Sequence, residues 1–512
     1  MRIWTGRAGS GKTTAILREI AALSEKGEGR QILLVPELNS HLMERRLAAA
    51  THNHGARTAE VLTFSRLADR VFSEVGGLAQ QMLTPAGQLL TLQEAARRVQ
   101  GGLRAWKGLA DKPELLQEAL RLIDECKTCA VAPETLFAAA EESEDAVLAE
   151  KLSDLAQILT AYERLCEASL PDPRDRLTHL RDRLAESHTL DGAAVYLDGF
   201  LGFTVQESAV VDAMLAAGVP LSAAVTCDTD YPEIFLTGCK TVQKLTRMAK
   251  HHNQTVERIE LGESKVARPA GLAALERESL LPVRTPQESA DGVRLYEAAS
   301  PFDECEHAAA YIRRKVRDEG ARCRDFVVAA RDIEPYSAFL AMAMARYDIP
   351  VFLAEKPDLL SRPPMALVTN ALEAVRNHFR YEDLFSCLKT GLAGLDWDEI
   401  DKLENYVLTW NIRGGAWERE WTEHPDGYGL PIDENAKAQL AELNTLRKRA
   451  IAPFSALREA LAGEQPAGDC VRALYAFLLA VDAPQRMTDR AAGHEQAGRL
   501  QLADEYRQLW EI

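Results

Sequence analysis

The chain has 512 residues, of which 46% are apolar and 27% charged, and its net charge at pH 7 is −17. These values are ordinary for a globular protein of about three or four domains. The charge excludes a uniformly basic nucleic-acid-binding coat, but it leaves room for a basic channel on an acidic body. No apolar run approaches the roughly 20 residues of a membrane span. Nine scattered cysteines indicate a reducing compartment, so we expect a cytoplasmic protein without membrane contact.

The most specific motif lies at the N-terminus. The apolar run Arg2–Thr5 leads into G-R-A-G-S-G-K-T, which fits the phosphate-binding pattern G-x-x-x-x-G-K-[ST]. In this pattern the glycines let backbone N–H groups face phosphate oxygens, the lysine reaches the outer phosphates, and the hydroxyl binds Mg²⁺. The helix-forming stretch Thr14–Leu23 comes next, so phosphates would also face a helix N-terminus. The predicted ATP-binding residues are Gly6, Arg7, Ala8, Gly9, Ser10, Gly11, Lys12 and Thr13.

Strands and helices alternate through the first 80 residues and again from residue 194 to residue 260. Strands are predicted at Arg2–Thr5, Gln31–Val35, Glu60–Thr63, Ala194–Asp198 and Val219–Cys227, with another before Glu260. Helices are predicted at Thr14–Leu23, Asn39–Ala50, Phe64–Val75 and Val205–Ala217. This alternation predicts a parallel sheet covered by helices on both faces. Between the two blocks, residues 84–185 show helical spacing and no clear strand, which indicates an all-helical insertion.

The second half repeats this organisation on a smaller scale. Three prolines among charged residues make Leu261–Gly292 a predicted linker. Strands are then predicted at Val293–Ala299, Phe326–Ala330 and Val351–Leu353, with helices at Asp303–Glu319 and Pro335–Tyr347. After about residue 380 the pattern is mostly helical. The chain stops inside a helical pattern, so we expect it to be part of something longer.

One acidic residue, Asp198, lies at a strand end that could contribute a ligand to Mg²⁺. The strand Ala194–Asp198 ends in a carboxylate, which together with Thr13 is predicted to bind Mg²⁺. The alternative is a strand-end carboxylate that makes a turn. An enzyme that hydrolyses ATP at such a site has a glutamate next, to orient the attacking water, whereas this chain has Gly199. We therefore predict ATP binding with slow or absent hydrolysis.

Several further segments carry a resemblance to a known family. They are I-L-L-V-P-E at 32–37, V-L-T-F-S-R-L-A at 61–68, V-Y-L-D-G-F-L-G-F-T-V-Q-E at 195–207, F-V-V-A-A-R-D at 326–332 and L-E-N-Y at 403–406. Together with the phosphate loop, they resemble the AddB (RexB) subunits of bacterial AddAB helicase–nucleases. The resemblance implies an α/β fold with two RecA-like P-loop NTPase lobes and all-helical insertions.

The implied domains follow the pattern of the elements. Residues 1–83 and 190–262 would form the first RecA-like lobe, 84–189 a helical insertion and 263–292 a linker. Residues 293–380 would begin the second lobe, and 381–512 would form a second helical insertion. The family's RecB-like nuclease domain and the cysteines of its [4Fe–4S] cluster would come later than residue 512. Within this chain, Cys126 and Cys129 form a C-x-x-C without two further ligands nearby, so ordinary packing is the favoured interpretation.

The resemblance also implies a function. The chain would be an ATP-binding subunit that works with an AddA-type helicase–nuclease subunit as a heterodimer and acts on DNA double-strand ends. It would scan single-stranded DNA for a recombination hotspot and guide the strand toward a nuclease. Two alternatives stay open: an autonomous P-loop ATPase or DNA helicase, and a non-catalytic DNA-binding scaffold.

Particular residues follow from the resemblance. Arg331 would reach the terminal phosphate of the nucleotide, although a surface arginine after a strand is also common. Ser40, Phe64, Arg66 and Phe203 would contact the scanned single strand, because aromatic rings stack on bases and arginine binds guanine or phosphate. Leu38 and Asp69 replace a polar amide and an aromatic residue of some relatives. From composition alone, Phe64 would instead be core and Arg66 a surface ion pair.

Overall fold

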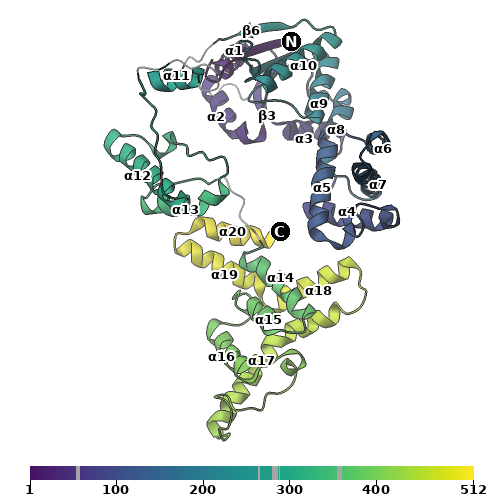
Figure 1. The fold of residues 1–512 in the computed structure, drawn as a ribbon, viewed down its shortest axis with the longest axis vertical. Helices are drawn as coiled ribbons and strands as arrows, with labels where there is room; N and C mark the ends of the chain where they lie inside the picture. The colour runs from purple at the N-terminus through teal and green to yellow at the C-terminus, as the bar shows by residue number, and fades with distance from the viewer. Residues whose placement is uncertain (53–57, 263–265, 279–285, 287–288, 354–359, 512) are drawn as a thin grey trace. The chain divides into compact units, whose positions relative to one another are not determined.

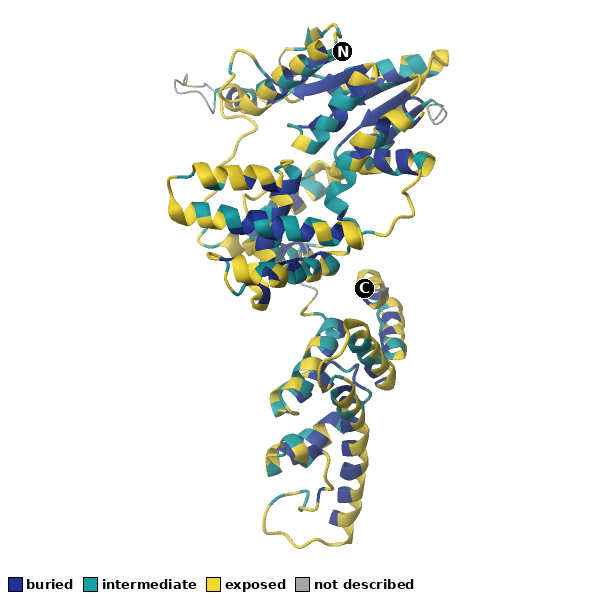
Figure 2. Ribbon diagram, turned by 90° about the vertical axis from the view of Figure 1, so that its right-hand side faces the viewer, coloured by how far each residue is buried: buried dark blue, intermediate teal, exposed yellow. Residues whose placement is uncertain are grey.

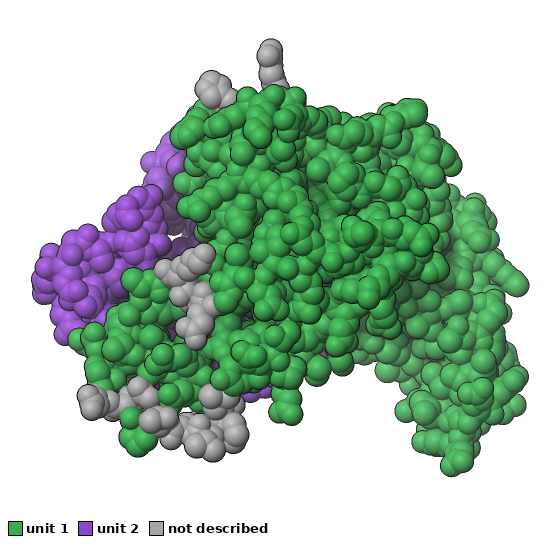
Figure 3. Space-filling view, turned by 90° about the horizontal axis from the view of Figure 1, so that it is seen from above, with its two compact units in different colours: residues 1–295 green, residues 296–512 purple. Residues whose placement is uncertain are grey.

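The computed structural model describes residues 1–52, 58–262, 266–278, 286, 289–353 and 360–511. Figure 1 traces the chain through these ranges. The chain divides into two compact units, Met1–Leu295 and Tyr296–Ile512, which Figure 3 colours separately.

The first unit is built on one parallel sheet. Its six strands are β1 (Arg2–Gly6), β2 (Arg30–Leu34), β3 (Ala59–Leu62), β4 (Ala193–Leu197), β5 (Leu221–Thr226) and β6 (Glu257–Glu260). Their order across the sheet is β3-β2-β4-β5-β1-β6, and every neighbouring pair is parallel. The strands predicted from the sequence in this part of the chain are therefore confirmed, with shifts of one or two residues at their ends.

Both faces of the sheet are buried along β1 to β5, as the dark strands of Figure 2 show, whereas the edge strand β6 is mostly exposed. Strand β2 illustrates why, because its side chains alternate between two apolar clusters. Leu33 packs with residues of α1 (Lys12–Lys26) and α2 (Ser40–Ala50). Ile32 and Leu34 pack on the other face with α3 (Phe64–Val75), α9 (Val205–Ala216) and α10 (Leu236–His251). All three side chains are fully buried. Each such burial is worth about 1.5–3 kcal/mol, which explains the near-continuous apolar run in the sequence.

The helices over the second face also have clear local causes. They are α3 (Phe64–Val75), α9 (Val205–Ala216) and α10 (Leu236–His251). The Thr63 hydroxyl accepts a hydrogen bond from the Arg66 backbone N–H and so caps α3. Thr204 and Glu207 form a reciprocal capping box at the start of α9. Glu207, nine residues after Asp198, therefore stabilises a helix end.

The predicted helical insertion is helical throughout its regular elements. It contains α4 (Pro85–Val99), α5 (Pro113–Thr128), α6 (Pro133–Glu142), α7 (Ala146–Ala168) and α8 (Arg176–Arg183). Helices α4, α5 and α7 share an apolar cluster that includes Leu92, Ile123 and Leu159. The linker predicted at 261–292 is not wholly irregular, because it contains the helix α11 (Ala270–Glu278). The run A-G-L-A-A-L-E-R-E favours this helix once Pro269 has ended the preceding segment.

The second unit departs from the prediction in one respect. Helices α12 (Pro301–Glu319) and α13 (Glu334–Arg346) form as expected, but no strand occurs among the described residues of 296–511. The segments 293–299, 326–330 and 351–353, predicted as strands, have no strand partner, and Leu295, Val327 and Phe352 are each at least 90% exposed. A strand requires a neighbour that satisfies its backbone N–H and C=O groups, so an apolar run alone does not produce one.

The rest of the second unit is helical, as predicted for residues after about 380. Its helices are α14 (Pro363–Arg376), α15 (Tyr381–Leu388), α16 (Trp397–Trp410), α17 (Glu434–Ala460), α18 (Ala467–Ala480), α19 (Ala483–Gln496) and α20 (Leu500–Glu511). They enclose a core with Trp417, Tyr406 and Phe454 at its centre. In neither unit do the described helices include one with the length and low charge that crossing a bilayer would demand.

Candidate functional site

The phosphate loop predicted from the sequence joins β1 to α1. Gly6, Gly9 and Gly11 all have φ values between +80° and +154°. Residues with a side chain rarely adopt this backbone conformation. A Cβ on Gly6 would also lie 2.7 Å from the Ser10 hydroxyl oxygen. Gly11 is the residue immediately before α1, so the loop ends directly at a helix N-terminus. Such a terminus carries a partial positive charge and free N–H groups, which suit an anion.

Lys12 lies inside this loop. It is 9% exposed, and its Nζ donates to the carbonyl oxygens of Gly6 at 2.8 Å and Arg7 at 2.9 Å. Burial lowers the pKa of Lys12, although the nearby Asp198 carboxylate opposes that effect. A phosphate would offer this ammonium a charged acceptor in place of two neutral carbonyls, which makes for a stronger hydrogen bond.

Thr13 and Asp198, predicted as a Mg²⁺ pair, do come together. Asp198 follows β4, is 3% exposed and lies close enough to the Thr13 hydroxyl for that group to lower the pKa of its carboxyl. Its Oδ2 atom is buried without a hydrogen-bond partner among the described residues. Burial raises the pKa of Asp198, outweighing the lowering by Thr13, Gly199 and Lys12. A buried carboxylate oxygen without a partner, beside a hydroxyl and a phosphate loop, has the donor chemistry that Mg²⁺ uses when phosphates and water complete its shell.

Binding of Mg²⁺ by Thr13 and Asp198 does not require a full set of protein ligands. No group of three or more His, Cys, Asp or Glu side chains within the described ranges could hold a metal. Magnesium at nucleotide sites is typically held by one or two protein oxygens together with substrate phosphates. The arrangement of Thr13 and Asp198 is of that kind.

The residue after Asp198 has a structural reason to be glycine. Gly199 has φ +84°, and a Cβ at this position would lie 3.1 Å from Asn39 Nδ2 and 3.4 Å from Pro36 Cδ. A glutamate here would be destabilised both by the left-handed backbone and by this crowding. The place of a water-orienting acid is therefore occupied by a tight turn.

Sequence reasoning missed one part of the site. Arg7 points to the loop after β5, where its Nε donates to Asp228 Oδ2 at 2.6 Å. Its guanidinium also lies 4.9 Å from the Tyr231 ring centre and 5.8 Å from that of Phe235. Burial opposes the charge of Arg7, but Asp228 outweighs it, and the pKa of Arg7 is raised. A sequence signal for this contact exists, because Asp228 follows an apolar strand just as Asp198 does.

The residues predicted to contact DNA lie after β2, β3 and β4. Parallel strands bring their carboxyl ends to one edge of the sheet, so these loops are neighbours. Phe64 and Phe200 meet edge to face at 5.6 Å between ring centres, and Phe200 and Phe203 lie 4.9 Å apart. Phe64 is 5% exposed and Phe203 half-buried, so Phe203 is the more accessible ring.

The polar members of this group have local partners. Ser40 donates to the Glu37 carbonyl at 3.0 Å, and the exposed Arg66 pairs with Glu44 on α2. Leu38 is 98% exposed, whereas Asp69 pairs with Arg176 of α8. The structure thus gathers Ser40, Arg66 and Phe203 at one sheet edge, and DNA contact there stays a prediction.

Arg331 belongs to the second unit. It is exposed and follows the segment 326–330, at the rim of a pocket that Glu304 and Tyr336 also line. Its predicted contact with nucleotide phosphate stays a prediction.

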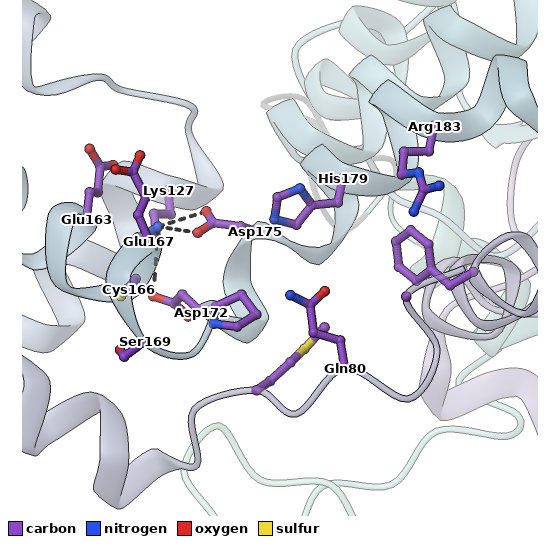
Figure 4. Close-up of a pocket in the computed structure, with 14 residues that line it drawn as sticks. Gln80, Lys127, Glu163, Cys166, Glu167, Ser169, Asp172, Asp175, His179 and Arg183 are labelled. Atoms are coloured by element: carbon purple, nitrogen blue, oxygen red, sulfur yellow. Dashed lines mark hydrogen bonds and ion pairs between the residues drawn. The ribbon is translucent and has the colours of Figure 1, made fainter. Parts of the chain in front are cut away.

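A second cavity of about 600 Å³ lies within the first unit, between α3 and the helical insertion (Figure 4). Lys127 points to Asp175, with Nζ–carboxylate distances of 2.6 and 2.8 Å, and lies 3.8 Å from Asp172. The fully buried Asp172 also accepts from Gln88, Tyr162 and the Arg174 backbone. Because these polar groups already have partners, the network is best explained as holding α4, α5 and α7 of the insertion to its segment 172–175.

Comparisons with known proteins agree with the resemblance seen in the sequence. A family model described as "ADDB, N-terminal" matches residues 3–276. The B subunit of an ATP-dependent helicase/deoxyribonuclease from Acetivibrio thermocellus is 33% identical, over 100% of this chain and 46% of the relative. Proteins of the same name from Desulforudis audaxviator and Thermoanaerobacter pseudethanolicus are 34% and 30% identical, covering 100% of this chain and 46% of each relative. The chain thus spans about half the length of the curated relatives it matches.

Proposed function

The chain belongs to the AddB family, and from that premise we propose that residues 1–83 and 190–262 form a RecA-like lobe that binds ATP·Mg²⁺ for a DNA helicase–nuclease complex. The observation that carries this proposal is the assembly of Lys12, Thr13 and Asp198 around a phosphate loop at the start of α1. The relatives are named as ATP-dependent, as helicases and as one subunit of a complex. A partner subunit of the AddA type fits the last of these.

Each residue has a defined task in this proposal. The backbone N–H groups of residues 9–13 and the Lys12 ammonium hold the phosphates. Thr13 and Asp198 hold the metal, which when bound neutralises phosphate charge. The turn at Gly199 leaves no acid to orient water, so the lobe holds nucleotide with little or no hydrolysis. We also propose that residues 293–380 begin a second RecA-like lobe, whose Arg331 meets the terminal phosphate.

The nucleotide proposal is tested by thermal or urea unfolding with and without ATP and Mg²⁺. ATP at about 100 times Kd should stabilise the wild type by roughly 2.7 kcal/mol. Lys12→Ala should abolish this shift, whereas Lys26→Ala, at the exposed end of the same helix, should keep it. An equal shift in Lys12→Ala would contradict the assigned role. A wild type without any shift would favour the non-catalytic scaffold, and a turnover on the order of 10 s⁻¹ would favour an autonomous ATPase.

We further propose that single-stranded DNA crosses the sheet edge near Ser40, Phe64, Arg66 and Phe203, where a hotspot sequence is scanned. Clustering of these strand-end loops supports the proposal, and the accessible Phe203 ring and Arg66 guanidinium supply stacking and guanine contacts. Each such contact is worth about 1–3 kcal/mol.

The DNA proposal is tested in the complex reconstituted with its partner. Phe203→Ala and Arg66→Ala should weaken the hotspot response by about tenfold or more and leave general, salt-dependent DNA binding nearly unchanged. Arg70→Ala is the matched control, because Arg70 is an exposed arginine of α3 that pairs with Glu60 instead. A hotspot response that stays intact in both test variants would place the scanning surface elsewhere. Phe64→Ala is unsuited to this test, because loss of a buried phenylalanine costs about 3–5 kcal/mol.

A further inference from the structure

Two cysteines of the first unit lie side by side at the end of β5. The sulfur atoms of Cys227 and Cys239 are 2.9 Å apart, and both thiols are free. Cys227 directly follows β5, and Cys239 lies in the first turn of α10. The two residues are twelve positions apart, so tertiary packing rather than helical spacing brings the thiols together.

The backbone around this pair is tightly packed. A Cβ on Gly238 would lie 1.9 Å from the carbonyl oxygen of Thr226, so α10 presses directly on the end of β5. This close approach holds the two sulfur atoms near each other. A disulfide needs a sulfur–sulfur distance of about 2.05 Å, so bond formation requires only a small movement of the two side chains.

The two thiols differ in access. Cys227 is 3% exposed, whereas Cys239 is half-buried. Burial, assisted by the hydrogen bond to Cys239, raises the pKa of Cys227 to about 12, so this thiol stays protonated near neutral pH. An oxidant from solvent therefore meets Cys239 first, and Cys227 is the neighbour that can resolve the product.

We propose that Cys227 and Cys239 form a reversible disulfide on exposure to a hydroperoxide. In the first step the Cys239 sulfur attacks the peroxide, the O–O bond breaks, and a sulfenic acid and water (or an alcohol) result. In the second step the Cys227 sulfur attacks the sulfenic sulfur, the S–O bond breaks, and the thiol proton of Cys227 passes to the departing oxygen, so that a second water leaves. Two thiols are oxidised and one peroxide is reduced. A dithiol reductant reverses the reaction.

The disulfide would close the loop that contacts the phosphate loop. Asp228, which accepts from Arg7, lies next to Cys227, and its carbonyl oxygen is 3.7 Å from the Cys239 sulfur. Tyr231 and Phe235, which flank the Arg7 guanidinium, lie within the same closed segment. Oxidation would thus fix the segment 228–236 against α10. The disulfide itself does not depend on nucleotide binding.

The experiment compares wild type, Cys239→Ser and Cys323→Ser after treatment with hydrogen peroxide. Cys323 is the matched control, because it is also half-buried but lies in the other unit. Cleavage after Glu233 separates the two cysteines, so a disulfide appears by mass spectrometry as two linked peptides. We expect this linked species in the wild type and in Cys323→Ser, its absence in Cys239→Ser, and its loss after dithiothreitol.

Amide hydrogen exchange provides the second readout. Exchange across residues 228–236 should slow in the oxidised wild type and stay unchanged in oxidised Cys239→Ser. Oxidation that leaves Cys227 and Cys239 unlinked, or that ends in a sulfinic acid at Cys239, would overturn the disulfide. Linked peptides without slower exchange would overturn the proposed fixing of the loop.

Discussion

Two regions of the molecule carry the same sequence signal with different results. In residues 1–262, short apolar runs before turn residues become strands of a buried parallel sheet. In residues 293–353, similar runs stay irregular and unpaired. The fully buried Leu33 and the 91% exposed Val327 exemplify the two outcomes. The difference shows that an apolar run becomes a strand only where neighbouring strands and covering helices are at hand.

The two regions also differ in the residues that come after each run. Asp198 after β4 is buried against a phosphate loop, whereas Arg331 and Asp332 after the segment 326–330 are exposed. A complete sheet edge fixes side chains in a dense environment, and such an environment shifts pKa values. Chemistry that depends on fixed charges is therefore expected in the first region.

The largest expected effect is the loss of stability when a buried side chain of the sheet is truncated. Leu33→Ala should destabilise the first unit by about 2–5 kcal/mol, because it leaves a cavity between the sheet and α1. Val327→Ala should change stability by no more than about 0.5 kcal/mol, because its side chain contacts little. Urea unfolding curves of the two variants measure the contrast. A loss above about 1 kcal/mol for Val327→Ala would show that the segment 326–330 is packed in solution.

A smaller effect is expected at the turn after β4. Gly199→Ala should cost more than the roughly 1 kcal/mol of a left-handed backbone, because Asn39 and Pro36 crowd the new Cβ. Gly218→Ala is the control, since Gly218 has a similar φ of +76° but nothing within 4 Å of the Cβ position. Urea midpoints compare the two variants. Equal costs would mean that the turn relaxes, and a glutamate could then be accommodated at residue 199.

The smallest expected effect is a pH dependence at Asp198. Because burial raises the folded-state pKa of this acid above its unfolded value, its charge destabilises the fold at pH values above the folded pKa. The penalty should vanish as pH falls below the unfolded pKa. Asp198→Asn should therefore gain stability relative to wild type near neutral pH and lose that gain in acid.

The matched variant for this measurement is Asp332→Asn, which alters an exposed carboxylate of the second region. The free energy of unfolding of Asp332→Asn should stay within about 0.5 kcal/mol of the wild-type value at every pH measured. Thermal unfolding without nucleotide, from acid to neutral pH, gives both curves. A wild type that lost stability relative to Asp198→Asn on acidification would reverse the expected sign.

Local patterns were sufficient for much of the first unit. The six strands and the phosphate loop could be predicted because each depends on a short run of residues. Apolar runs of Ile, Leu and Val form strands, and glycines allow the positive φ values of the loop. The pairing of Thr13 with Asp198 was also predictable, because both residues follow strands of one parallel sheet.

Contacts between distant residues were not predictable in this way. Arg7 and Asp228 are 221 positions apart. The place of Asp228 after an apolar strand indicates a position at the sheet edge, but neither segment identifies the other as its partner. Whether Phe64 is core or surface, and whether 326–330 becomes a strand, likewise depends on which other segments pack there. The sequence by itself determined the phosphate loop, most of the helices and the strands of the sheet, because backbone preference and hydrophobic periodicity act over a few residues. Only the tertiary structure decided the Arg7 contact, the burial of Phe64 and Asp198, and the unpaired state of 326–330, because burial and pairing are properties of neighbours in space.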